Sequence, residues 1–267
     1  MKFVETSGVT PFTRALFQGE PYTVVNPYKG CQYGCSHCSA QIPTKTAYPG
    51  YRWGEIVEVR EDILDSVEKN ASRWAGKKIY LSSLGDPYQP AEKKYKITRG
   101  LLERLADIDC HVRLITHSDL VLRDLDVLKH MNNVHVGISL TTTNDFHVKL
   151  IEGKLPSSDE RVETLYALGD SGITTFLNID PFLPEITPLF RLIDLFNDDV
   201  SFFRIASPNW KANIVKKNLF ELLKIYEPEL FIRYQTIYLK NGKYYDEIRK
   251  KMNKNESSRS VEIDITI

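Results

Sequence analysis

The fold of this protein is decided by the stretch Asn26-Pro27-Tyr28-Lys29-Gly30-Cys31-Gln32-Tyr33-Gly34-Cys35-Ser36-His37-Cys38. Its cysteines are spaced Cys-x3-Cys-x2-Cys, and Gly30 and Gly34 permit the turns that bring three thiols together from one loop. Thiolate is the soft ligand that iron–sulfur clusters prefer, and three thiolates on a four-iron cluster leave one iron without a protein ligand. Metal chemistry takes place at such an open position. We therefore predict that Cys31, Cys35 and Cys38 bind a [4Fe-4S] cluster.

Strand patterns and helical patterns alternate on both sides of this loop. The strand patterns cover residues 22–25, 78–81, 112–115, 134–138, 173–179 and 202–205. The helical patterns cover residues 63–74, 97–105, 122–128, 159–168, 189–195 and 219–225. This alternation is typical of βαβ units, and six of them in about 200 residues predict an α/β fold, a partial (β/α)6 TIM-type barrel with a parallel sheet. The cysteine loop follows the first strand directly.

We expect one domain over residues 1–267, with the barrel core over about 20–210 and a short C-terminal extension over about 211–267. Ser157, followed by Asp159 and Glu160, predicts a helix start because it offers a cap with acids in the first turn. Residues 261–267 alternate strictly between apolar and polar, which predicts an edge strand or a docking strand.

Composition narrows the class of protein. The chain has 267 residues, with 35 Lys and Arg against 35 Asp and Glu, so its formal net charge is zero and a surface built wholly for polyanions is excluded. Hydrophobic residues make up 42%, which excludes wholesale disorder. No apolar run is long enough to span a membrane, and no apolar signal core follows Met1. We expect a cytoplasmic protein, and a tight cysteine cluster in that reducing compartment favours metal binding over disulfides.

Two other interpretations of the cysteines stay open. A structural zinc site would use the three cysteines with His37 or another histidine, although adjacent His37 and Cys38 do not easily bind one tetrahedral ion. Cys110 stands at the start of a strand, on the opposite face of a parallel sheet from the cysteine loop, so we expect a buried hydrophobe there and no fourth ligand. The alternative function is a non-catalytic iron–sulfur or zinc protein that senses redox state or serves as a binding module.

The cysteine spacing after the first strand of such a barrel resembles the radical S-adenosylmethionine (SAM) superfamily. Over about residues 20–210 the chain is similar to the branch related to spore photoproduct lyase, often labelled DNA repair photolyase-like. The motifs that carry the resemblance are Asn26-Pro27-Tyr28-x-Gly30-Cys31, Gly85-Asp86-Pro87-Tyr88-Gln89-Pro90-Ala91-Glu92, Tyr95-x-x-Thr98-Arg99, Ile115-Thr116-His117-Ser118-Asp119-Leu120-Val121-Leu122-Arg123-Asp124-Leu125 and Val136-x-Ile138-Ser139-Leu140-Thr141-Thr142.

The resemblance implies a lyase-like radical SAM enzyme. In that superfamily the open iron of the [4Fe-4S] cluster binds the amino and carboxylate groups of S-adenosyl-L-methionine. A one-electron reduction cleaves the S–C5′ bond, and the 5′-deoxyadenosyl radical that results abstracts a hydrogen atom from the substrate. The resemblance also implies an electron donor such as flavodoxin or ferredoxin.

The same resemblance points to the carboxyl ends of the strands, where such barrels carry their active sites. The segment after the second strand would receive the methionine amino group, and later strand ends would meet the ribose or carboxylate. The candidate cofactor-binding residues there are Ser82, Ser83, Asp86, His117, Ser139 and Asn178, with Thr116, Ser118, Thr141 and Asp180 beside them. His37 precedes the third cysteine, where the superfamily usually has an aromatic residue against adenine.

The chain departs from the branch at three positions that concern the substrate. His117 stands where relatives often carry Lys, Ser39 where they often have an aromatic residue, and Ser82-Ser83 where spore photoproduct lyases have a hydrogen-donating cysteine. We therefore carry over the cofactor chemistry without that substrate. A nucleic acid, a peptide and a small metabolite stay open as substrates.

Two groups of residues favour a nucleic acid substrate, although the balanced net charge weakens the case. The basic residues are Lys211, Lys216, Lys217, Lys240, Lys243, Arg249, Lys250, Lys251 and Lys254. The aromatic residues that would offer stacking surfaces are Phe12, Tyr51, Trp53 and Trp210. Solvated helix faces are the alternative explanation of the basic residues.

Overall fold

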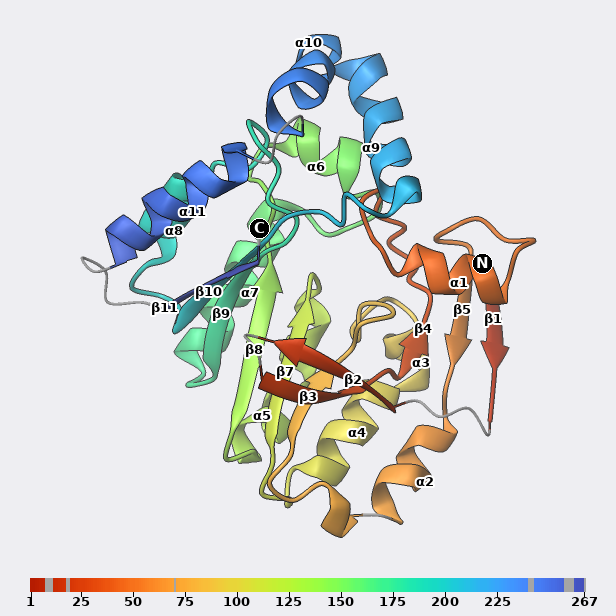
Figure 1. Ribbon diagram of the computed structural model, residues 1–267. Coiled ribbons are helices and arrows are strands. Elements are labelled where there is room, and N and C mark those ends of the chain that lie inside the picture. Colours follow the sequence, from red (N-terminus) through yellow and green to blue (C-terminus); the bar gives the residue numbers. More distant parts are fainter. Residues whose placement is uncertain (8–11, 18–19, 70, 240–242, 257–261, 267) are drawn as a thin grey trace.

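The computed structural model describes residues 1–7, 12–17, 20–69, 71–239, 243–256 and 262–266. Its main sheet has eight strands (Figure 1). In spatial order these are β11 (Glu262–Thr266), β10 (Phe202–Ala206), β9 (Thr174–Ile179), β8 (Val134–Ser139), β7 (His111–Thr116), β6 (Lys78–Leu81), β3 (Glu20–Val25) and β2 (Phe12–Phe17). All neighbours are parallel except β2 and β3.

The six strands from β3 to β10 are the six that the sequence pattern predicts, and they lie side by side in chain order. This confirms the partial (β/α)6 barrel. Their register brings strand ends level, because Leu81 pairs with Leu114 and Ser139 pairs with Asn178. Polar residues that follow the strands therefore meet at one edge of the sheet.

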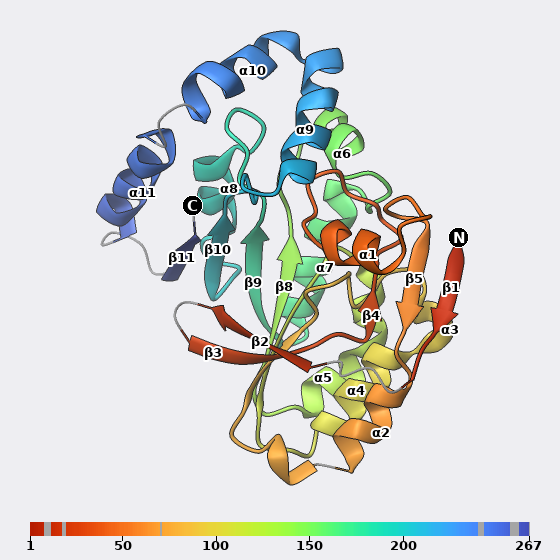
Figure 2. The same ribbon diagram turned by 45° about the vertical axis from the view of Figure 1, so that its right-hand side comes forward.

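Helices that connect the strands cover the outside of the barrel (Figure 2). They are α2 (Asp62–Glu68), α4 (Ile97–Leu105), α5 (Leu125–His130), α7 (Ser158–Asp170) and α8 (Leu189–Phe196). Their apolar faces and the outward side chains of the strands form one core, which includes Leu101 and Leu165 from the helices and Leu81, Leu114 and Val136 from the strands. The predicted start of α7 is confirmed, since Ser157 and Glu160 form a reciprocal capping box.

Further helices lie around the cysteine loop and in the C-terminal part. They are α1 (Gln41–Ala47), α3 (Glu92–Tyr95), α6 (Asp145–Ile151), α9 (Asn213–Tyr226), α10 (Pro228–Arg233), η3 (Tyr234–Tyr238) and α11 (Lys243–Glu256). The predicted C-terminal strand is confirmed as β11, which pairs in parallel with β10 and extends the sheet by one strand. In the described part of the chain, no helix is long and apolar enough to cross a membrane.

Two predicted helices are wrong in extent. The pattern over residues 63–74 gives α2, which ends at Glu68, and a separate 3-10 turn η1 (Ala71–Arg73). The pattern over residues 122–128 is divided between the 3-10 turn η2 (Asp119–Asp124) and α5, because the Ser118 side chain caps the turn by accepting from the Leu120 N–H. Strand β2 and a small sheet in the order β1 (Lys2–Glu5), β5 (Ile56–Val59) and β4 (Tyr28–Lys29) were not predicted.

Candidate active site

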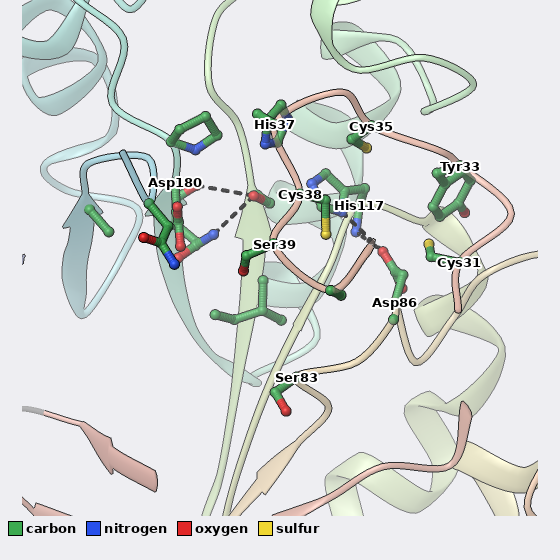
Figure 3. Close-up of a pocket in the computed structure, with 18 of the residues that line it drawn as sticks. Cys31, Tyr33, Cys35, His37, Cys38, Ser39, Ser83, Asp86, His117 and Asp180 are labelled. Carbon is green, nitrogen blue, oxygen red and sulfur yellow. Dashed lines mark hydrogen bonds and ion pairs between the residues drawn. The ribbon is translucent and has the colours of Figure 1, made fainter. Parts of the chain in front are cut away.

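A cavity of about 460 Å³ opens at the carboxyl ends of the barrel strands. Figure 3 shows the three cysteines of the loop on one side of it and Asp180 on the other. Every residue that the sequence assigns to the cluster or to cofactor binding lines this cavity, namely Cys31, Cys35, Cys38, His37, Ser82, Ser83, Asp86, His117, Ser139 and Asn178. Thr116, Ser118 and Thr141 are buried behind them and are not part of its lining.

The cysteine loop is held by contacts along its length. Gly30 and Gly34 have φ of +94° and +69°, and a side chain at Gly30 would lie 2.3 Å from the Ile56 carbonyl oxygen. Cys35 Sγ donates to the Glu152 carbonyl oxygen at 3.3 Å, and Ser36 Oγ donates to the Ile151 carbonyl oxygen at 2.8 Å. Directional contacts with the end of α6 thus fix the path of the loop between its second and third cysteines.

The donor set of this loop fits an iron–sulfur cluster. All three thiols are free and face one cavity, among the apolar surfaces of Tyr33, Trp53 and other residues of the loop region. Burial raises the pKa of each thiol, for Cys38 to about 11, so a metal that binds there must displace protons. Cys110 is free, is buried, and directly precedes the amino end of β7, as predicted.

A single-ion site is not formed by these residues. Within the described ranges, no three His, Cys, Asp or Glu side chains are grouped so that they could hold one metal ion. The zinc interpretation therefore gains no support.

Ser82 and Ser83 are organised by a residue that the site prediction missed. Asn26 Oδ1 accepts hydrogen bonds from the Ser83 and Leu84 N–H groups at 2.8 and 3.1 Å. The same oxygen accepts from Ser82 Oγ at 3.3 Å and from Ser83 Oγ at 3.2 Å. In the sequence analysis Asn26 was part of the cysteine motif and was not predicted as a site residue. It directly follows β3, which pairs with β6, and this position could have predicted its contact with Ser82 and Ser83.

Asp86 is surrounded by donors from its own chain. Its carboxylate accepts from the Tyr88 N–H at 2.8 Å, from Thr116 Oγ1 at 2.7 Å and from the His117 N–H at 2.9 Å. His117 Nδ1 lies 3.0 Å from Asp86 Oδ2, which leaves Nε2 as the other ring nitrogen for the cavity. Both carboxylate oxygens are thus already hydrogen-bonded, and a direct contact of Asp86 with an amino group stays a prediction.

Ser139 and Asn178 are joined across neighbouring strands. Asn178 Nδ2 donates to Ser139 Oγ at 2.9 Å, and Arg204 Nη1 donates to Asn178 Oδ1 at 2.7 Å. Arg204 also forms an ion pair with Asp180 at 2.8 Å. Arg204, on β10, was not predicted as a site residue, because a charged residue in a strand normally predicts an exposed face.

His37 lines the cavity with a half-buried ring. Its Nε2 has no hydrogen-bond partner among the described residues. Burial lowers its pKa, so the neutral imidazole is the favoured form. An uncharged ring is suited to stack on a flat heterocycle.

A buried ion pair behind the cavity was also missed. Arg161 is fully buried, and its guanidinium donates to Glu152 Oε2 at 2.6 Å and to the Ser139 carbonyl oxygen at 3.1 Å. Because the Glu152 carbonyl oxygen accepts from Cys35, Arg161 connects the end of β8 to the cysteine loop.

The aromatic residues proposed for nucleic-acid contact differ in their surroundings. Trp210 is partly buried against Phe220 and Tyr234, and its use as a stacking surface stays a prediction. Phe12 packs edge-on against Trp74 at 5.0 Å, whereas Trp53 lines the cavity and Tyr51 is exposed. Lys240 and the side chain of Lys254 lie outside the described residues.

Comparison with known families identifies the family of this chain. The sequence matches the Radical SAM superfamily over residues 25–187, which is more than half of its length. The chain belongs to the radical SAM superfamily. The superfamily implies S-adenosylmethionine and a [4Fe-4S] cluster as cofactors and supports an enzyme.

The relatives of this radical SAM chain include proteins without an assigned activity. An uncharacterized protein of Methanocaldococcus jannaschii is 31% identical over 221 residues, which cover 83% of both chains. An uncharacterized protein of Mycobacterium tuberculosis is 27% identical over 174 residues, which cover 62% of this chain and 51% of that protein.

Two kinds of solved structure share the fold. A spore photoproduct lyase mutant with bound AdoMet and dinucleoside spore photoproduct has a TM-score of 0.65 at 14% identity, over 81% of this chain and 66% of that chain. Streptococcus suis SuiB bound to precursor peptide SuiA has a TM-score of 0.56 at 14% identity, over 91% of this chain and 48% of that chain. At this identity the likeness is one of fold, and this chain is shorter than either structure it matches.

Proposed function

We propose that this chain is an enzyme that reductively cleaves S-adenosylmethionine at a [4Fe-4S] cluster bound by Cys31, Cys35 and Cys38. The observation that carries the proposal is that three free thiols of one loop share a cavity with the polar ends of the barrel strands. When bound, the cofactors supply a 5′-deoxyadenosyl radical that abstracts a hydrogen atom from a substrate.

In this proposal the chain's own residues position the cofactor. Ser82 and Ser83 present hydroxyls that Asn26 fixes, and His117 presents the ring nitrogen that Asp86 leaves available. Ser139 and Asn178 form the wall on the neighbouring strands, where they would meet the ribose or the carboxylate. His37 would lie against the adenine. Side chains held by such contacts need little rearrangement when the cofactor binds.

The electron and the substrate come from outside the chain. We propose a protein donor such as flavodoxin or ferredoxin, because Cys31, Cys35 and Cys38 are all used as ligands and Cys110 lies at the other end of the barrel. A nucleotide-containing substrate is favoured by the spore photoproduct lyase of the same fold, which binds a dinucleoside. Addition of the true substrate should increase 5′-deoxyadenosine formation above the uncoupled rate.

The experiment is anaerobic. The protein is reconstituted with iron and sulfide, S-adenosylmethionine and dithionite are added, and 5′-deoxyadenosine is quantified by chromatography. We expect product above a no-protein control and none from the variant Cys31→Ala/Cys35→Ala/Cys38→Ala. Cys110→Ala is the matched control, since it removes a buried thiol at the opposite end of the barrel and should keep the activity. Product formation by the triple variant would overturn the proposal.

A further inference from the structure

A second cavity, of about 380 Å³, lies away from the cysteines. Its lining comes from β2, β3, α2, η1 and the segment that leads into β6. Phe12 and Trp74 contribute rings, and Arg14, Arg73 and Lys77 contribute cations. Lys77 directly precedes β6, so this cavity lies toward the amino end of that strand, whereas the cysteine cavity lies at the carboxyl ends.

The charged side chains that line this second cavity are all positive. None of the described residues that line it is acidic. Arg14, Arg73 and Lys77 also form no ion pair with the described carboxylates, whereas Arg60, Arg99 and Arg123 are each paired. Three cations at one concavity without a counter-charge attract an anion.

Neutral donors accompany the cations. Trp74 is only 6% exposed, and its Nε1 has no acceptor among the described residues. The hydroxyl-bearing residues Thr13 and Thr23 also contribute to the lining. Because the Trp74 ring is covered, it offers no face for stacking, so recognition here rests on donors and charge.

We propose that this second cavity binds the phosphate group of an anionic ligand, with Arg14, Arg73 and Lys77 as its charged contacts. Guanidinium groups match the geometry of phosphate oxygens, and Lys adds a point charge. The volume exceeds that of a phosphate ion and leaves room for the group that carries it. That carrier is a mononucleotide or the backbone of a nucleic-acid strand, which share this chemistry. The site is independent of the radical chemistry proposed above.

The test uses the full reconstituted chain and calorimetric titration in about 50 mM NaCl, where phosphate contacts are strong. The probes are pyrophosphate, AMP and a single-stranded oligothymidylate. We expect at least one of these probes to bind, and we expect its Kd to increase about tenfold or more in the variant Arg14→Gln/Arg73→Gln. The matched control Lys93→Gln/Lys129→Gln removes two exposed cations elsewhere and should leave the Kd unchanged. Tightest binding of AMP identifies the mononucleotide, and tightest binding of the oligonucleotide with a steep salt dependence identifies the strand.

Two results would overturn this site. One is that no probe binds at low salt, and the other is that both double variants weaken binding equally. Indole emission locates the ligand, because the chain has three tryptophans and Trp74 alone lines this cavity. An emission change on binding that persists in Trp74→Phe would also place the ligand elsewhere. Unchanged 5′-deoxyadenosine formation in the double variants shows that they are folded. If the unsubstituted protein also forms no 5′-deoxyadenosine, the proposed radical chemistry fails, but the binding measurement still tests the second cavity.

Discussion

The two ends of the barrel interior hold polar side chains in different ways. At the carboxyl ends, Asp86 and Asn178 are hydrogen-bonded to groups on neighbouring strands and loops. Toward the amino ends, Arg113, His111 and His135 each have a buried nitrogen without a hydrogen-bond partner among the described residues. Directional bonds therefore fix Asp86 and Asn178 beside the cavity, whereas packing holds the three side chains toward the amino ends of the strands.

Aromatic rings surround Arg113, which lies toward the amino end of β7. Its guanidinium carbon lies 4.8 Å from the centre of the Phe202 ring, 5.7 Å from Phe176 and 5.5 Å from Tyr22. Cation–π attraction replaces part of the missing hydrogen bonding. The comparison predicts that deletion of a bond is costly at the carboxyl ends and that a change of volume is costly at the amino ends.

The largest effect is expected for Arg161→Met, because it leaves the carboxylate of Glu152 buried without its partner. We expect a loss of about 3–5 kcal/mol in the free energy of unfolding, measured by urea denaturation. Arg249→Met breaks an exposed pair with Asp246 and should cost about 0–1 kcal/mol. The double variant Arg161→Met/Glu152→Leu should recover much of the loss. A cost near that of Arg249→Met would contradict the role given to this pair.

A smaller loss is expected for Asp86→Ala, which leaves Thr116, His117 and the Tyr88 N–H without their shared acceptor. We expect about 2–3 kcal/mol of lost stability and a drop of about tenfold in 5′-deoxyadenosine formation, since His117 loses its fixed orientation. Asp86→Asn keeps one acceptor oxygen and should retain part of both. Equal behaviour of the two variants would show that these hydrogen bonds do not control the site.

Sequence pattern and structure agree where the cause is local or periodic. The strands follow from apolar runs, and Ser139 and Asn178 meet because neighbouring parallel strands end level. The partners of Asp86 and Arg161 were not predictable, because they depend on where loops and helix starts far apart in sequence are placed. Arg113 was missed for another reason: a charged residue in a strand normally predicts an exposed face, and here that side chain is buried in the barrel interior.

Gly137→Ala tests the packing of aromatic rings inside the barrel. A Cβ at Gly137 would lie 2.3 Å from the Phe176 ring, so the ring that stacks on Phe202 must move. We expect a loss of about 1–3 kcal/mol in thermal or urea unfolding. Gly169→Ala is the matched control in α7, where nothing lies within 4 Å, and should be neutral or stabilise by up to about 1 kcal/mol. If both substitutions change the free energy of unfolding by the same amount, the close packing of Phe176 against Gly137 does not contribute to stability.

The smallest effect is a pH dependence carried by His111. Burial, then His135, Arg113 and Lys78, lower its pKa in the folded state to about 4, and Glu20 opposes them only weakly. In the unfolded chain the ring takes up a proton near its ordinary pKa of 6.5. Between pH 6.5 and 4 the unfolded state therefore binds more protons than the folded state, so the free energy of unfolding decreases as the pH is lowered. Allowing for solvent screening, we expect His111 to account for about 1–2 kcal/mol of that fall. Urea unfolding at pH 7 and pH 5 should show a shallower decline in His111→Gln than in the parent, while His130→Gln, at an exposed histidine, should keep the parent's slope. Equal slopes in all three proteins would mean that folding does not lower the pKa of His111, and the contrast between the two ends of the barrel would then lose its electrostatic basis.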